Sequence, residues 1–269
     1  MSEAGLAPAS GFEARLRAEQ ALHPERPTPA WQFRELSPPI DSANMRQANW
    51  LAMRDAIVQA VDHDGFDAVL LLHGTDTLAY SAAALSFLLL GIPVPVLLTG
   101  SMLPAGSPGS DAWPNLFGAL AALAEGCRPG VHLYFDGQLH CARASKLKSE
   151  AFDAFVNMAR PRHGQYLEQL PEALHYRRPR CAVALAVVPL FPGLGTAQLR
   201  AVLASGVQGV LLECYGSGTG PADDAEFLAA LREARQRGVV LGAISQCPLG
   251  HVDFAVYAAG SALAEAGLV

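Results

Sequence analysis

Residues Phe66–Leu90 read FDAVLLLHGTDTLAYSAAALSFLLL, and this stretch decides the predicted fold. Its first part, Phe66–Leu72, is a short apolar run that is typical of a buried strand, and Thr77–Leu90 has the pattern of a helix. The polar turn HGTDT, at His73–Thr77, joins the two. A buried strand that passes through a tight polar turn into a helix is the repeating unit of α/β proteins.

The same alternation of strand and helix continues along the chain. We expect a strand at Ile92–Leu98, a helix at Asp111–Glu125 and a strand at Val131–Phe135. This order predicts an α/β fold with a mostly parallel open sheet flanked by helices. Further elements are expected as strands at Cys181–Val188, Gly209–Glu213 and Val239–Ile244 and as helices at Ala197–Ala204, Asp223–Arg237 and Phe254–Ala266.

A change of composition divides the chain. Residues 160–180 are rich in Pro, Arg, His and Glu and show little periodicity, which indicates an interdomain linker. We therefore expect a large N-terminal domain over residues 1–159, which carries the functional site. A smaller C-terminal α/β domain is expected over residues 181–269.

Composition excludes several classes of function. The 269 residues carry a net charge of -6, which argues against nucleic acid as a partner because phosphate contacts need clustered Lys and Arg. The longest apolar runs fall short of the ~20 residues that a membrane span requires, so no membrane association is expected. The five cysteines form no CxxC pair, which predicts reduced thiols in a cytoplasmic protein. The histidine spacing predicts no metal site.

Two polar turns are candidates for function, and local pattern alone gives each a structural explanation. Ligands of open parallel sheets bind beyond the carboxyl ends of strands, where Thr75 and Asp76 lie. Either residue would also serve as an N-cap of the following helix, and the local pattern favours that reading. Asp41–Met45 is expected to open an amphipathic helix that runs to about Val61, with Ser42 as its cap.

Two later segments complete the set of candidates. Lys146 lies in an apolar segment of low charge, and a partly buried lysine loses proton affinity and can act as a base. Spacing alone, however, favours solvated loop positions for Lys146 and Lys148. The turn Thr99–Pro104 (TGSMLP) continues to Ser110 and Asp111. We interpret one of these two residues as the cap of the following helix, and we assign them no chemistry beyond shaping the turn.

These pieces together resemble the bacterial-type asparaginase family, and most closely its cytosolic type I branch. The resemblance covers nearly the whole chain in the family's order. The segments that carry it are HGTDTLAYSAAALSFLL, VLLTGSMLP, FDGQLHCARASKLKSEAFDAF, LECYGSGTGP and ISQCPLGHVDFAVYAAGSALAEAG. It implies hydrolysis of L-asparagine through a threonine nucleophile and a β-aspartyl acyl-enzyme, without a cofactor, in a homodimer or homotetramer.

The resemblance also implies roles for individual residues. Thr75, Asp76 and Lys146 correspond to a catalytic Thr-Lys-Asp triad. Ser42 would hold the substrate's α-carboxylate and Asp76 its α-amino group, while the backbone around Ser101 would lie against the substrate amide. The expected substrate-binding set is Asp41, Ser42, Thr75, Asp76 and Ser101.

The sequence departs from the family pattern at its ends. Family members begin with a strand ending in TGGTIG, whose threonine is the primary nucleophile, and we expect that this chain lacks that strand and a C-terminal segment. Three functions are therefore considered: an asparaginase, a related amidase such as a glutaminase or an amidotransferase subunit, and a non-catalytic fragment that binds amino acids. Binding of asparagine or aspartate without release of ammonia would distinguish the non-catalytic fragment from the two enzymes.

Overall fold

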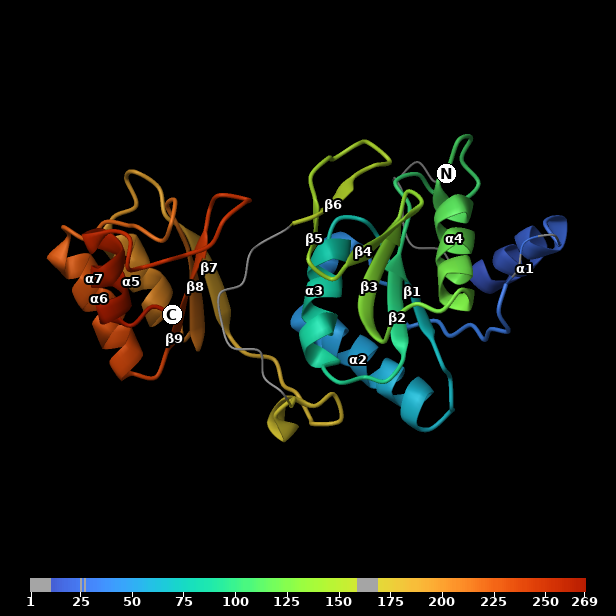
Figure 1. The fold of residues 1–269 in the computed structure, drawn as a ribbon, viewed down its shortest axis with the longest axis horizontal. Helices are drawn as coiled ribbons and strands as arrows, with labels where there is room; N and C mark the ends of the chain where they lie inside the picture. Colours follow the sequence, from blue (N-terminus) through green and yellow to red (C-terminus); the bar gives the residue numbers. More distant parts are fainter. Residues whose placement is uncertain (1–10, 25, 27, 159–168) are drawn as a thin grey trace. The chain divides into compact units, whose positions relative to one another are not determined.

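The computed structural model describes residues 11–24, 26, 28–158 and 169–269. These residues form two compact units, which Figure 1 shows in blue to yellow and in orange to red. One unit reaches to Asn157 and also takes in the segment that ends at Arg180. The other runs from Cys181 to Val269.

The first unit is built on a four-stranded sheet. Its strands follow the order β1 (Val69–Leu72), β2 (Pro95–Thr99), β3 (Gly130–Phe135) and β4 (Gln138–Cys141). Strands β1, β2 and β3 run parallel to one another, and β4 pairs antiparallel with β3. Because parallel strands point the same way, the turns after β1 and β2 emerge at the same edge of the sheet.

Helices cover both faces of this sheet. Figure 1 shows α3 (Leu78–Leu88) and α4 (Ala112–Ala124) on opposite sides of it, with α2 (Gln47–Asp62) next to α3. Alternate strand residues face each layer, as the two-residue period of a strand requires. The core below α2 and α3 contains the fully buried side chains Ile57, Leu78, Leu85, Leu98, Leu133 and Phe135.

Helix α1 (Phe12–Leu22) is an element that the sequence patterns did not predict. It is largely exposed, and Leu16 is its buried residue. Leu16 packs with Phe117 of α4, and Phe12 stacks on Trp113 with ring centroids 5.7 Å apart. The helix is thus attached to the first unit by a short apolar stripe, which is why its overall polarity conceals it in the sequence.

The hairpin from β3 to β4 was also not predicted. Asp136 and Gly137 connect the strands, with φ angles of 47° and 71°. Positive φ at both central residues defines the tight turn whose twist matches that of antiparallel strands, and Asp-Gly is a preferred pair for it. The dipeptide was therefore a readable signal for the fourth strand.

A short antiparallel ribbon follows the sheet. Strand β5 (Ala144–Lys146) pairs with β6 (Phe155–Asn157), and Lys146 lies opposite Phe155. The ring of Phe155 packs against that of Phe135, with centroids 4.8 Å apart. This contact fixes the ribbon, and hence the backbone of Lys146, to the core of the first unit.

The predicted helix from Asp41 to about Val61 is wrong at its start. A separate 3-10 turn, η1 (Ser42–Asn44), comes first, and α2 begins at Gln47. Met45 between them is extended, with ψ of 136°. Asp41, rather than Ser42, is the cap of η1, because its side chain accepts the N–H of Ala43.

Part of the predicted linker packs on the first unit. Residues 160–168 lie outside the described residues, but η2 (Glu172–Leu174) and the residues after it are described. The side chain of Tyr176 is 1% exposed, and its hydroxyl donates to Asp62 at 2.8 Å. Arg177 also pairs with Asp62 at 2.8 Å. The described part of this segment therefore packs in the core of the first unit.

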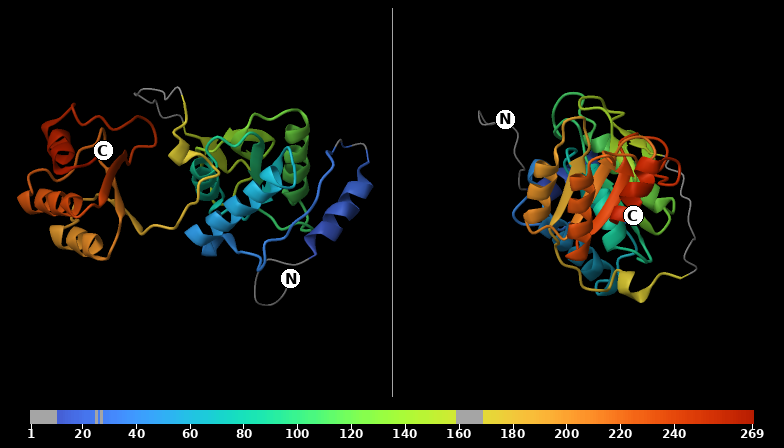
Figure 2. Two further views of the ribbon diagram at one scale, coloured as in Figure 1. Left: turned by 90° about the horizontal axis from the view of Figure 1, so that it is seen from below. Right: turned by 90° about the vertical axis from the view of Figure 1, so that its left-hand side faces the viewer.

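The second unit is a smaller parallel sheet with the order β7 (Leu185–Pro189), β8 (Gly209–Cys214) and β9 (Val240–Ser245). Figures 1 and 2 show α5 (Thr196–Ala204), α6 (Ala225–Gln236) and α7 (Ala258–Ala266) gathered on one face of it. The core between them contains Leu199, Leu212, Phe227, Leu231 and Leu263, none of them exposed. None of the helices in the described part of the chain is long and apolar enough to cross a membrane.

Candidate active site

The turns after β1 and β2 pack directly against one another. The N–H of His73 donates to the carbonyl of Thr99 at 2.9 Å, which extends the pairing of the two strands. A Cβ at position 100 would lie 2.1 Å from the carbonyl oxygen of His73. Gly100 is therefore required here, because only a residue without a Cβ lets the two backbones approach so closely.

Thr75 and Asp76 lie in the turn between β1 and α3, and neither caps that helix. The N-cap position of α3 is Thr77, and no side chain makes a cap hydrogen bond there. The Thr77 hydroxyl donates instead to the carbonyl of Ser42 at 2.8 Å. The capping role favoured by the local pattern is thus absent, and the side chains of Thr75 and Asp76 remain for another role.

Lys146 joins this turn from far away in the sequence. Its Nζ donates to Oγ1 of Thr75 at 3.1 Å across 71 residues of sequence. The same Nζ lies 3.8 Å from Oδ1 of Asp76. The Lys146 side chain is 20% exposed, while that of Lys148 is 50% exposed and pairs with Asp153. The solvated position expected from spacing is therefore that of Lys148, not of Lys146.

Ser42 lies against the same turn. It is buried, and a Cβ at Gly74 would lie 2.4 Å from its Oγ. Together with the hydrogen bond from Thr77, this contact holds η1 beside the HGTDT turn. Asp41 is exposed, and its carboxylate is engaged by the N–H of Ala43 at 3.1 Å. The structure thus brings Ser42 to the turn, and it places Asp41 at the edge of η1.

Ser101 follows Gly100 in the second turn and is half-buried. Among the described residues, no hydrogen bond joins its side chain to Thr75 or to Lys146. The structure therefore places Ser101 in the neighbouring turn without a direct link to the triad. The expectation that the backbone of this turn faces a substrate amide stays a prediction.

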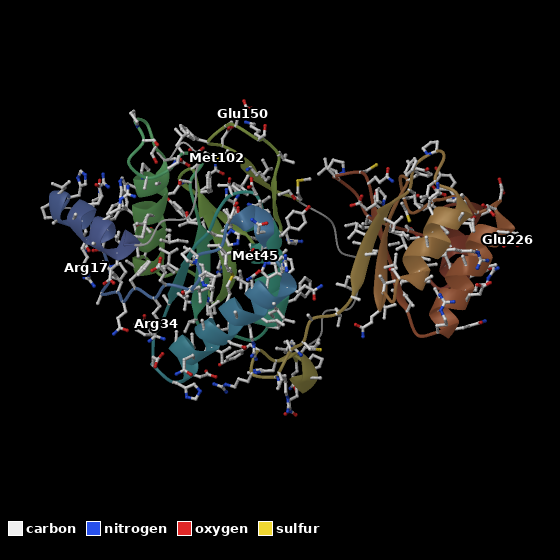
Figure 3. All side chains as sticks on the ribbon, turned by 180° about the vertical axis from the view of Figure 1, so that it is seen from behind. Arg17, Arg34, Met45, Met102, Glu150 and Glu226 are labelled. Atoms are coloured by element: carbon white, nitrogen blue, oxygen red, sulfur yellow. The ribbon has the colours of Figure 1, made fainter. Side chains whose placement is uncertain are left out.

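The second turn is held in shape by two buried residues at the start of α4. The carboxylate of Asp111 accepts the N–H of Met102 at 2.9 Å and that of Leu103 at 3.0 Å. Asn115 donates to the carbonyl of Gly100 at 2.9 Å and to Asp111 at 3.0 Å. Figure 3 labels Met102 at this end of the sheet. Asp111 therefore shapes the turn, as predicted, but its side chain makes no cap hydrogen bond to α4. The part of Asn115 was missed.

The three converging groups have a recognisable chemistry. An alcohol becomes a useful nucleophile when a neighbouring base takes its proton, and the amine of Lys146 is within hydrogen-bond distance of the Thr75 hydroxyl. The exposed carboxylate of Asp76 is available to bind a cationic group of a ligand. The arrangement is suited to acyl transfer on a small substrate that carries a positive charge.

Two family profiles match the sequence. Residues 4–178 match the family described as "Asparaginase, N-terminal", and residues 184–269 match "Glutaminase/Asparaginase C-terminal domain". The two matches agree with the family resemblance of the HGTDT and TGSMLP segments.

Individual proteins agree with these profiles. L-asparaginase 1 of Escherichia coli K12 is 36% identical, over 100% of this chain and 82% of that protein. L-asparaginase of Thermococcus kodakarensis is 35% identical, over 86% of this chain and 72% of that protein. The crystal structure of L-asparaginase I from Vibrio cholerae superposes with a TM-score of 0.82 at 30% identity, over 100% of this chain and 83% of that one. The chain therefore belongs to the asparaginase family of amidohydrolases.

Proposed function

We propose that this chain hydrolyses the side-chain amide of L-asparagine to L-aspartate and ammonia. The observation that carries the proposal is the 3.1 Å hydrogen bond between Nζ of Lys146 and Oγ1 of Thr75. It supplies a hydroxyl and an adjacent amine at the edge of the sheet where ligands of such folds bind. The L-asparaginases of Escherichia coli and Vibrio cholerae support the choice of substrate.

The proposed reaction has two steps, and it uses Thr75 as the nucleophile in place of the TGGTIG threonine that the family resemblance implies. Lys146 in its neutral form accepts the hydroxyl proton of Thr75 as Oγ1 attacks the amide carbon of asparagine. The tetrahedral intermediate collapses when the amide nitrogen takes that proton and leaves as ammonia, so that a β-aspartyl ester remains on Thr75. Water then attacks the ester, one of its protons returns through Lys146 to Oγ1, and aspartate is released.

The proposed substrate contacts select a free amino acid. Asp76 would pair with the α-ammonium group, because its carboxylate is 63% exposed and reaches the same space as Lys146. Ser42 would donate to the α-carboxylate, with Asp41 fixing the turn that carries it. The backbone at Ser101 would line the side-chain amide. Two charge-assisted contacts of this kind orient the amide for attack.

We further propose a cytoplasmic homodimer or homotetramer that works without a cofactor. The domain limits proposed from the sequence are residues 1–159 and 181–269, with residues 160–180 between them. The division of the chain at Arg180 and the family matches that end at residue 178 and start at residue 184 support this arrangement. Size-exclusion chromatography with light scattering tests the assembly state.

A glutaminase is the second candidate, because the family description of residues 184–269 names both activities. The two substrates differ by one methylene, which a binding pocket distinguishes by only about 1–3 kcal/mol. A value of kcat/KM for L-glutamine that equals or exceeds that for L-asparagine would favour this candidate. Binding of asparagine without ammonia release would point to the non-catalytic alternative.

The test is ammonia release from L-asparagine and L-glutamine by the purified chain, by Lys146→Met and by Lys148→Met. Lys148→Met is the matched control, because Lys148 lies two residues away and pairs with Asp153 instead of Thr75. We expect release from asparagine that is lost in Lys146→Met and retained in the control. A folded chain that releases no ammonia, or equal loss in both variants, would contradict the proposal.

A further inference from the structure

A chain of side-chain hydrogen bonds runs beneath the turn that carries Thr75. Nε1 of Trp50, in the first turn of α2, donates to Oγ of Ser81 at 2.8 Å. Oγ of Ser81 lies 2.8 Å from Nε2 of His73, and Nδ1 of His73 lies 2.6 Å from the carbonyl oxygen of Gly74. The chain thus links two helices to the peptide group directly before Thr75.

When His73 is neutral, the chemistry of these groups fixes the direction of every hydrogen bond in this chain. A carbonyl oxygen only accepts, so Nδ1 of His73 must carry the proton that it shares with Gly74. Nε2 of the neutral ring is then an acceptor, and it receives the hydroxyl proton of Ser81. The hydroxyl oxygen in turn accepts the indole N–H of Trp50, which is a donor only. Each group has one consistent role when His73 is neutral.

The surroundings favour this neutral ring. Ser81 is fully buried and Trp50 and His73 are half-buried. Burial lowers the pKa of His73, an effect that its hydrogen bond to the Gly74 carbonyl partly opposes. The network therefore contains a histidine whose tautomer is set by its partners rather than by solvent.

Holding the Gly74 carbonyl also orients Thr75. The peptide bond is planar and trans, so the N–H of Thr75 points away from the carbonyl that His73 holds. No hydrogen bond joins that N–H to another described residue. The same peptide group is closely packed on one side, where a Cβ at Gly74 would meet Oγ of Ser42 at 2.4 Å, and a Cβ at Gly100 would lie in ordinary van der Waals contact with Thr75 Cγ2 at 3.8 Å. Rotation of this peptide would therefore displace the Thr75 side chain.

We propose that His73, as the neutral Nδ1–H tautomer, is a positioning residue that holds the Gly74–Thr75 peptide so that the Thr75 hydroxyl meets Lys146. The inference rests on the proposed amide hydrolysis. His73 acts through Gly74, and its ring forms hydrogen bonds with Gly74 and Ser81, not with Thr75 Oγ1 or Lys146. Ser42 has its own support through Thr77, so substrate binding depends on His73 less than the reaction step does.

The first experiment tests the hydrogen-bond network of His73 in the absence of substrate. In uniformly 15N-labelled protein at pH 7, we expect the His73 ring nitrogens to show a protonated Nδ1 and an unprotonated Nε2. We also expect the amide resonance of Thr75 to move strongly in His73→Phe and much less in His73→Asn, since an asparagine amide can donate from the position of Nδ1. An imidazolium, the Nε2–H tautomer, or an unmoved Thr75 amide in His73→Phe would overturn the inference.

The second experiment measures kcat and KM for L-asparagine in the same variants. Misplacement of a reacting group by about 1 Å costs on the order of 10²-fold in rate, so His73→Phe should lose about that factor in kcat with KM changed by less than about threefold. His73→Asn should recover most of the loss. His63→Asn, on the exposed end of α2, is the matched control and should behave as the wild type.

The two experiments separate this inference from the proposed function. A wild-type chain that shows the expected tautomer and Thr75 response but releases no ammonia would refute the proposed function and leave the structural role of His73 in place. An active wild type whose kcat is unchanged in a folded His73→Phe would overturn the positioning role alone. Thermal unfolding of each variant shows whether it is folded.

Discussion

Both units end their parallel strands in polar turns, but they use the polar side chains of those turns differently. In the second unit, the Ser245 hydroxyl donates to the carbonyl of Gly216 and accepts the N–H of Cys247. The amide of Gln246 donates to the carbonyl of Glu213 at 2.7 Å. These side chains bond to backbone groups, among them those of the neighbouring strand β8 and the turn that follows it.

In the first unit the corresponding side chains meet each other instead. Lys146 donates to Thr75 and approaches Asp76, and neither member of that turn caps α3. Backbone at this edge is held by other residues, such as Asp111 and His73. Both units thus place polar side chains where parallel strands end, and their hydrogen-bond partners distinguish the group with a proposed reactive role from the groups that hold the backbone.

Removing the Thr75 hydroxyl should have the largest effect on activity. Thr75→Val keeps the branched shape but has no proton to transfer, so we expect ammonia release from L-asparagine to fall by about 10²–10⁴-fold. Thr75→Ser keeps the hydroxyl and should retain a substantial part of the rate. Steady-state ammonia assays on both variants make the comparison, and equal activity of Thr75→Val and Thr75→Ser would refute a chemical role for the hydroxyl.

Neutralising Asp76 should weaken substrate recognition. A hydrogen bond to a charged group contributes about 1.5–3 kcal/mol, so Asp76→Asn should lower kcat/KM for L-asparagine by about 10–10²-fold. A substrate without the α-ammonium group, N-acetyl-L-asparagine, should be almost insensitive to the change. A similar loss of kcat/KM for both substrates would show that Asp76 acts elsewhere than at the ammonium group.

Ser245→Ala tests the structural role that the polar side chains have in the second unit. Its hydroxyl donates to the Gly216 carbonyl and accepts the Cys247 N–H, so its removal should lower the free energy of unfolding by about 1–2 kcal/mol. Denaturant titration measures this loss. Ammonia release by the folded variant should match the wild type, and a large fall in kcat without a loss of stability would place chemistry in the second unit.

The smallest expected effect is on the pH dependence of stability. Burial lowers the pKa of His73 below its ordinary value of 6.5, so the unfolded chain binds the proton more readily than the folded one. The stability that depends on the neutral ring is therefore full above about pH 6.5 and is lost as the pH falls toward the lowered value. Thermal unfolding between pH 8 and 5 should show a shallower decline in His73→Asn than in the wild type.

The sequence predicted much of the fold because strands and helices alternate with strong apolar patterns. It missed α1, whose apolar stripe is short, and the β3–β4 hairpin, although Asp136 and Gly137 were a signal for it. It also placed the start of α2 too early, since a 3-10 turn followed by extended Met45 is set by packing of Ser42 against Gly74 and not by local propensity.

The site was less accessible to local reasoning. Spacing alone favoured caps for Thr75 and Asp76 and a solvated position for Lys146, because a contact between residues 71 apart leaves no local pattern. Family resemblance supplied these candidates, and the folded structure brings Thr75, Asp76 and Lys146 together. His73 was missed because its partners are the adjacent Gly74 carbonyl and Ser81 in α3, and Asn115 because it bonds to the Gly100 carbonyl of another turn; no side-chain motif encodes such contacts.

The most direct test of the account is to trap the proposed ester. The chain is mixed with L-asparagine, quenched with acid during turnover, digested and analysed by mass spectrometry, with Thr75→Ser and Thr75→Val treated in parallel. We predict an aspartyl group on the peptide that contains position 75 in the wild type and in Thr75→Ser, and none in Thr75→Val. Ammonia release with an unmodified Thr75 peptide and an aspartyl group on another residue would contradict the assignment of Thr75 as the nucleophile.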